Sequence, residues 1–158
     1  MSPSQDAKQF SRVSIIVLGL ILALAAVIRL ARLDSVQTGF QVDEASNAWN
    51  AYSLLHTGRD EWGKPWPVFY ARAFDDYRSP IYLYFLMPFQ ALGGMNVYTT
   101  RLPAAISGIV TVALIYFIGR RMFNPAVGLL AAAFLALAPS HVEYSQWGYE
   151  ASLSPLLF

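Results

Sequence analysis

Residues 13–28, VSIIVLGLILALAAVI, form a run of sixteen residues without a charge. Arg12 precedes this run, and Arg29 and Arg32 follow it. The long apolar stems of arginines extend such a run to the length that crosses the core of a bilayer. We therefore predict a transmembrane helix over residues 13–32, preceded by a polar cytoplasmic tail over residues 1–12.

A cleaved signal peptide is the alternative interpretation of this run. Lys8 and Arg12 form a basic n-region, and residues 23–25, Ala-Leu-Ala, resemble a cleavage site. The apolar run is long for a signal peptide, and arginines follow it directly. These two features favour the membrane span.

The composition of the whole chain agrees with a membrane protein. Of its 158 residues, 56% are hydrophobic and 13% are charged, whereas about 25% of the residues of a soluble domain are charged. This argues against an ordinary soluble enzyme and against a disordered chain. The net charge of +1 makes no case for a nucleic-acid partner. Because the chain has no cysteine, disulfides and thiolate metal sites are excluded.

A long polar segment over residues 33–101 follows the first span. It contains seven Asp or Glu side chains and three of the four tryptophans, which is typical of a water-facing loop at a membrane surface. Apolar residues recur at helical spacing after Asp43, and Gly58 follows them as a helix end. We predict an external loop with surface helices near residues 44–57 and 80–92.

The remaining sequence alternates between apolar and polar segments. We predict the following elements: a second span over residues 102–119, a cytoplasmic turn over 120–125, a third span over 126–140, an external loop over 141–150, and the start of another helix over 151–158. The last segment is an apolar helix that does not finish, so the chain looks cut short. The predicted fold class is an all-α integral membrane protein.

Basic residues indicate how these spans are oriented. Arg120 and Arg121 lie in a very short loop, and Lys8 and Arg12 precede the first span, so both segments are predicted to be cytoplasmic. Two spans then separate them, and residues 33–101 and 141–150 share the outer face. The acidic residues of both loops are therefore able to converge.

Short motifs follow one another along these segments: Asp43-Glu44-Ala45, residues 54–60 (LLHTGRD), 63–67 (GKPWP), 101–105 (RLPAA), 119–123 (GRRMF), 138–141 (APSH) and 144–145 (YS). In this order they resemble the membrane glycosyltransferases of the GT-C fold. The similarity is greatest to the protein O-mannosyltransferase-like and aminoarabinose-transferase-like enzymes, and it covers roughly residues 13–158. The resemblance implies that this chain is the N-terminal part of a longer enzyme and is inactive alone.

The resemblance also implies a reaction. These enzymes transfer a sugar, here expected to be mannose-like, from a polyprenyl-phosphate-linked donor to a protein, lipid or glycan acceptor. The transfer takes place on the periplasmic or extracellular side of the cell (inner) membrane, where the enzyme is multi-pass and in contact with membrane lipids. A non-enzymatic membrane protein, such as a transporter segment or scaffold, is the alternative. The predicted spans carry almost no charge, which argues against a transport pathway.

The resemblance assigns catalytic roles to three carboxylates. Asp43 matches the family's loop aspartate, proposed to activate the acceptor hydroxyl, and Glu44 lies beside it. Glu150 matches the acidic residue after the Tyr-Ser segment, where the family more often has aspartate. Each also has a structural interpretation, as a helix cap or as part of the first turn of a helix.

Substrate-binding roles fall on five further residues: Arg101, Arg78, Tyr82, His141 and Tyr144. The guanidinium groups are expected at the donor phosphate. Arg101 has the alternative of anchoring at the interface, and Arg78 that of pairing with an aspartate at position 75 or 76. Tyr82 is a candidate for lining a prenyl groove, and His141 and Tyr144 lie near the proposed site. No cofactor is predicted, and no metal site, because an isolated His and Glu lack further ligands.

Overall fold

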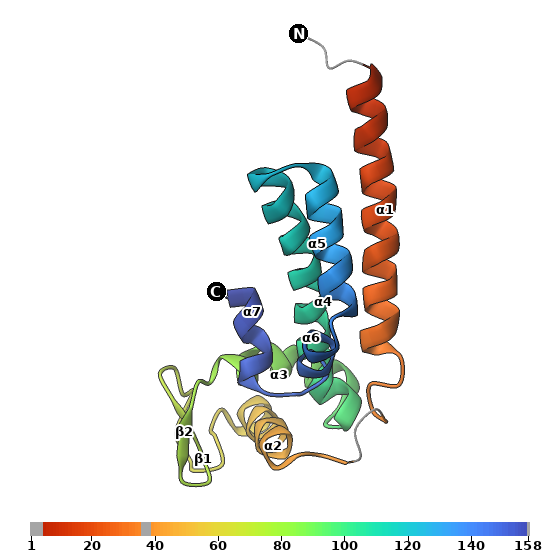
Figure 1. Cartoon of the computed structure of the whole chain (residues 1–158). Coiled ribbons are helices and arrows are strands. Elements are labelled where there is room, and N and C mark those ends of the chain that lie inside the picture. The colour runs from red at the N-terminus through yellow and green to blue at the C-terminus, as the bar shows by residue number, and fades with distance from the viewer. Residues whose placement is uncertain (1–4, 36–38, 158) are drawn as a thin grey trace.

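The computed structural model of this chain describes residues 5–35 and 39–157 and is mostly helical, as the composition predicts. Three helices lie side by side as a bundle, and two shorter helices and a β-hairpin lie across one of its ends (Figure 1). The elements in chain order are α1 (Gln5–Leu30), α2 (Val42–Thr57), β1 (Ala71–Ala73), β2 (Asp76–Arg78), α3 (Ile81–Gly93), α4 (Val97–Met122), α5 (Pro125–Leu137), α6 (Pro139–Tyr144), the 3₁₀ helix η1 (Glu150–Leu153) and α7 (Ser154–Leu157).

Two of the described helices are long and apolar enough to cross a membrane, over Arg12–Leu30 of α1 and Val97–Met122 of α4. The predicted third span is shorter than expected, because α5 has 13 residues and ends before Pro139. At about 1.5 Å per residue it is about 20 Å long, less than the roughly 30 Å of a bilayer core. The two long apolar helices support a membrane protein. The third span and the GT-C architecture stay predictions.

The first helix begins earlier than the sequence analysis predicts. Residues 1–4 of the predicted tail lie outside the described residues, and α1 is already formed at Gln5. Helix α4 also begins earlier, at Val97, because Asn96 caps it with a side chain that accepts a hydrogen bond from the amide of Thr99 at 2.9 Å. Arg101 consequently lies in the second turn of the helix and does not precede it.

The surface helices have bounds close to those predicted. Helix α2 starts at Val42, and its N-cap is Gln41, whereas the sequence analysis named Asp43 as the cap. It ends at Gly58, whose φ of 68° is readily adopted only by glycine. Helix α3 covers Ile81–Gly93. Three apolar clusters hold the described residues together: one within the bundle, one where α2, α3, α4 and η1 meet, and one where α2, α3 and β1 meet.

Two segments predicted to be irregular have regular structure. The part of the predicted external loop between its two surface helices, residues 58–79, contains the antiparallel hairpin β1–β2, which has three residues in each strand. Strands this short carry too few alternating residues to be predicted from periodicity. The second external loop is helical over α6, because Pro139 stands at the first position of this helix, where its missing N–H costs nothing.

Helices α4 and α5 approach each other closely at two glycines. A Cβ atom at Gly128 would lie 2.6 Å from the carbonyl oxygen of Tyr116, and one at Gly119 would lie 2.9 Å from the Cα of Gly128. Small residues of this kind allow membrane helices to pack backbone against backbone. Asn124 and Pro125 make the turn between the helices, with the Asn124 side chain accepting from the amide of Val127 at 2.9 Å.

Replacement of Gly128 by alanine is expected to force α4 and α5 apart. The added Cβ has only backbone atoms and a tyrosine ring to displace, so we expect a loss of about 1–3 kcal/mol in the free energy of unfolding. Gly19→Ala is the matched control, because nothing lies within 4 Å of a Cβ there. Thermal unfolding of the full-length protein in detergent measures both. Equal unfolding midpoints for the two variants would contradict the close packing.

Candidate functional site

A buried ion pair joins Glu44 on α2 to Arg101 on α4, at the end of the bundle that α2 and α3 cross. The guanidinium donates through Nε to Glu44 Oε1 at 2.8 Å and through Nη2 to Oε2 at 2.9 Å. The side chains are 1% and 0% exposed, respectively. A two-point contact of this kind fixes both the distance and the angle between the two helices.

Both groups have further partners. Arg101 donates to the backbone carbonyls of Leu33 and Gly39, at 3.0 and 2.9 Å, in the segment between α1 and α2. Glu44 accepts from the amides of Gly148 at 2.7 Å and Gln41 at 3.2 Å, which gives its carboxylate four hydrogen bonds. Burial alone would raise the pKa of Glu44, but the bonds from Arg101, Gly148 and Gln41 outweigh it and hold the pKa below its ordinary value.

This arrangement favours structural roles for Glu44 and Arg101 over the predicted catalytic and phosphate-binding ones. A carboxylate that accepts four hydrogen bonds has no position left for an acceptor hydroxyl. A guanidinium that is fully buried and bonded to Glu44, Leu33 and Gly39 does not face a phosphate. The two residues are better interpreted as the support on which the site is built.

Helix α2 also fixes the segment that precedes η1. Glu44 accepts from the N–H of Gly148, and Asn47 donates to the carbonyl of the same residue at 3.3 Å. On its other side, Gly148 lies against α4, where a Cβ atom would come within 2.9 Å of the carbonyl oxygen of Thr100. The loop that leads to Glu150 is therefore held between α2 and α4 by its backbone.

Asp43 faces outward from the same helix turn. Its Oδ1 lies 2.7 Å from Nη2 of Arg78, the last residue of β2, and the side chains are 45% and 16% exposed. Arg78 also lies 3.8 Å from Asp76, through Nε, whereas Asp75 pairs with Arg72. The predicted pairing of Arg78 with a neighbouring aspartate is therefore a minor contact beside its contact with Asp43.

The charges of acidic side chains on α2, α6 and η1 act on Tyr149. Burial raises the pKa of its phenol, and charges on Glu150, Asp43 and Glu143, as well as the neighbouring Tyr144, raise it further. The carboxylates of Asp43 and Glu150 thus act on one group, although they are 107 positions apart in the sequence. They are two of the three carboxylates to which the resemblance assigns catalytic roles.

A small cleft of about 120 Å³ lies beside this cluster, lined by Glu143, Tyr144, Trp147 and Tyr149. Within the described residues, two buried polar atoms nearby have no hydrogen-bond partner: the indole Nε1 of Trp147 and Oε2 of Glu150. A buried polar atom without a partner is costly unless a ligand or a water molecule satisfies it. This side of the molecule therefore has both a donor and an acceptor available to a ligand.

The remaining predicted site residues lie in different places. Tyr144 is exposed beside the cleft. Tyr82 is fully buried and donates to the carbonyl of Thr100 at 2.7 Å, so the prenyl groove predicted for it is not favoured. His141 lies against α1, where its Nδ1 accepts from Nη2 of Arg29 at 2.8 Å. Burial and the charge of Arg29 lower the pKa of His141.

Sequence reasoning missed four residues that build the site: Asn47, Trp147, Gly148 and Tyr149. Gly148 had a usable signal, because a glycine between two aromatic residues in a polar segment often marks a close approach of backbones. Asn47 had none. Among residues 5–35 and 39–157, no three His, Asp or Glu side chains lie together as metal ligands.

Residues 77–153, just under half of the chain, match the family model described as dolichyl-phosphate-mannose-protein mannosyltransferase. The predicted resemblance to a GT-C mannosyltransferase is confirmed. The matched segment begins in β2 and ends in η1, so it includes Arg78, Arg101 and Glu150, while Asp43 and Glu44 precede it. No curated protein and no solved structure gives a significant match. At the level of the family, the match points to a membrane glycosyltransferase.

Removal of one partner of the central ion pair is expected to be strongly destabilising. Glu44→Gln leaves a buried guanidinium without its counter-charge, so we expect a loss of about 3–5 kcal/mol in the free energy of unfolding. Arg72→Gln is the control, because it breaks an exposed pair, with Asp75, of a kind worth about 0–1 kcal/mol. Thermal unfolding of the full-length protein reports both. Similar losses of unfolding free energy in the two variants would show that the pair between Glu44 and Arg101 does not stabilise this end of the molecule.

The lowered pKa of Glu44 predicts an acid dependence of stability. A carboxyl group whose pKa is lowered on folding adds stability above its unfolded pKa, about 4.3, and loses it as the pH falls through the folded value. The wild-type protein should therefore lose this contribution only below about pH 4.3, whereas Glu44→Gln lacks it at every pH. The unfolding midpoints of the wild type and of Glu44→Gln, measured from pH 7 to pH 3, should therefore approach each other as the pH falls. A constant difference between the two proteins would contradict the assignment.

Proposed function

We propose that this chain carries the catalytic face of a membrane glycosyltransferase that transfers a mannose-like sugar from a polyprenyl-phosphate donor to an acceptor hydroxyl. The observation that carries the proposal is the position of Asp43, half exposed at 2.7 Å from Arg78 and beside the cluster that contains Glu150. The family match over residues 77–153 supports the reaction class. The identity of the donor, the acceptor and the side of the membrane belong to the proposal.

In the proposed reaction Asp43 is the general base. It takes the proton from the acceptor hydroxyl as the oxygen forms its bond to the anomeric carbon of the sugar. The bond from that carbon to the phosphate oxygen breaks, and the polyprenyl phosphate leaves with the electron pair. Attack opposite to the leaving phosphate inverts the anomeric configuration. Glu150, whose Oε2 has no partner within the described residues, orients the acceptor.

Arg78 is the residue proposed to meet the donor phosphate. Its guanidinium is partly exposed and already positioned at the base, whereas that of Arg101 is buried. A planar guanidinium suits a phosphate through two parallel hydrogen bonds. In the proposed reaction the donor phosphate draws Arg78 away and leaves the Asp43 carboxylate free to meet the acceptor hydroxyl.

The arrangement of the bundle supports the proposed sidedness. The start of α1 and the turn between α4 and α5 lie at one end, and α2, α3 and the hairpin lie at the other (Figure 1). Arg120 and Arg121, the predicted cytoplasmic markers, are in the last turn of α4, close to that turn. Asp43 and Arg78 then belong to the opposite, outer face.

Asp43→Asn is expected to remove most of the transfer activity. A neutral amide does not accept the proton, and the loss should be about 10²–10⁴-fold in kcat. Asp75→Asn is the matched control, because that side chain is 96% exposed and pairs only with Arg72 among the described residues. The measurement is the transfer of radiolabelled sugar from polyprenyl-phosphate donor in membranes containing the full-length protein. Full activity in Asp43→Asn would exclude this residue as the base.

Arg78→Gln is expected to weaken donor binding and slow transfer together. We expect a loss of about 10²-fold in kcat/KM for the donor, of the size seen when a charge-stabilising donor is removed. Arg72→Gln removes the same charge from the neighbouring strand and should leave kcat and the KM for the donor unchanged. Donor titrations with the two variants make the comparison. If Arg78→Gln behaves as Arg72→Gln does, the phosphate must be bound elsewhere.

The proposed sidedness predicts opposite labelling of two introduced thiols. This chain has no cysteine, so Val68→Cys and Asn124→Cys each add a single thiol, at exposed positions. An impermeant maleimide should label Val68→Cys in intact cells and Asn124→Cys only after the membrane is opened. Labelling of both from the same side would refute the arrangement of spans. Labelling in denaturant controls for the amount of protein.

A further inference from the structure

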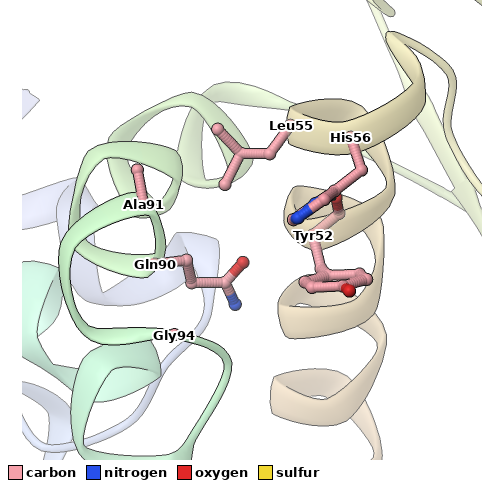
Figure 2. A pocket seen from close by; sticks show the side chains of 6 residues that line it. All are labelled: Tyr52, Leu55, His56, Gln90, Ala91 and Gly94. Carbon is pink, nitrogen blue, oxygen red and sulfur yellow. The ribbon is translucent and has the colours of Figure 1, made fainter.

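A second cleft lies between α2 and α3, apart from the site just described. It measures about 390 Å³ and is lined by Tyr52, Leu55, His56, Gln90, Ala91 and Gly94 (Figure 2). Among the described residues, its lining combines aromatic, apolar and neutral polar side chains and contains no carboxylate, lysine or arginine. A concave site of this size and composition is typical of a small, mostly uncharged ligand.

Helix geometry separates this cleft from Asp43. Tyr52 comes nine residues after Asp43 on α2, which is about 14 Å along the helix axis and roughly half a turn around it, at about 100° per residue. The two residues therefore lie on opposite faces of the same helix. A ligand in the cleft would not touch Asp43 or Arg78.

Gln90 supplies an acceptor that the protein itself does not use. The side chain is 4% exposed, and its Nε2 donates to the carbonyl of Ala48 at 3.0 Å. Because a carbonyl only accepts, this bond fixes which end of the amide is nitrogen. Its Oε1 is buried and has no partner within the described residues. Figure 2 shows this amide pointing from α3 across the cleft toward Tyr52 and His56.

Tyr52 and His56 form the opposite wall. Their rings are in contact and tilted, with centroids 4.1 Å apart and planes inclined by 30°. The Nδ1 of His56 lies 2.9 Å from the carbonyl oxygen of Tyr52, so in the neutral ring Nδ1 is the donor. Its Nε2 then carries a lone pair and is an acceptor. Trp49 stacks on Tyr52 at 5.9 Å and extends the aromatic surface.

We propose that this cleft binds a neutral polyhydroxylated ring, that is, one saccharide unit. Two acceptors, on Gln90 and His56, require a ligand that brings hydroxyl donors. The exposed aromatic wall suits the C–H face of a pyranose ring, and the volume suits a single ring. A phosphate or carboxylate has no cation here, and an ammonium group has no carboxylate. The saccharide is either part of a soluble glycan or the headgroup of a glycolipid, which share this chemistry.

The test is saccharide binding by the full-length protein in nanodiscs prepared without sugar-based detergents. Saturation-transfer NMR measures binding of methyl α-mannopyranoside and methyl β-glucopyranoside, and discs that contain a monoglucosyl lipid provide the second source. We expect Tyr52→Leu and His56→Phe to bind at least about tenfold more weakly than the wild type, as the loss of packing or of one hydrogen bond predicts. Both positions are exposed, so these variants should fold.

Tyr98→Leu is the control, because it removes an exposed tyrosine of α4 that does not line the cleft. The proposal is supported if the wild type binds a soluble glycoside or the glycolipid, and if Tyr52→Leu and His56→Phe both weaken that binding. Failure of the wild type to bind either source, or equal binding by wild type and both variants, overturns it. Gln90→Met adds a third variant, compared only if its unfolding midpoint equals that of the wild type.

Asp43→Asn separates this inference from the proposed transfer reaction, on which it does not rest. This variant should lose transfer activity and keep the cleft's saccharide binding. If Asp43→Asn abolishes binding while Tyr52→Leu keeps it, the probe occupies the transfer site, and the inference fails while the proposed function stands. If Tyr52→Leu lowers saccharide binding while Asp43→Asn stays fully active in transfer, the inference for the cleft is supported and the assignment of Asp43 as the base is wrong.

Discussion

The two-point contact between Glu44 and Arg101 is the interaction on which the rest of this end of the molecule depends. It joins α2 to α4, holds the segment before α2 through the carbonyls of Leu33 and Gly39, and holds the segment before η1 through the amide of Gly148. Burying two charges is costly, and the cost is offset only when their hydrogen-bonding positions are filled. Here each further bond also fixes another segment, so one pair determines where four parts of the chain lie.

The consequence is a division of roles between two neighbouring carboxylates. Asp43 and Glu44 are adjacent in the sequence, yet a helix turns by about 100° per residue. One carboxylate therefore points into the protein while the other faces outward, half exposed, to Arg78. The buried one orients α2, and the outward one is positioned by that orientation. A rigid support beneath a partly exposed carboxylate is what precise positioning of the proposed base requires.

The sequence predicted the end of α2 at Gly58, the extent of α3 and the turn at Asn124, whereas α1 and α4 begin several residues before the predicted positions and α6 was predicted as loop. What could not be predicted was the partner of each charge. Arg101 is 57 positions from Glu44, and only the packing of α4 on α2 shows that they meet. The same holds for Asp43 and Arg78, because the hairpin that brings them together has strands too short to leave a periodic signal. Sequence reasoning therefore located the acidic motif and assigned its two carboxylates the same role.

The hairpin links the chemistry to the shape of the surface. Arg78 is the last residue of β2, and through it the strand is paired to the first turn of α2. In the proposed reaction the donor phosphate competes with Asp43 for this guanidinium, so donor binding and the position of the hairpin cannot be independent. The α2 end of the contact is held by the buried pair, whereas the hairpin is exposed along β2. Any movement on donor binding therefore falls on the hairpin, and Asp43 keeps its place while its counter-ion leaves.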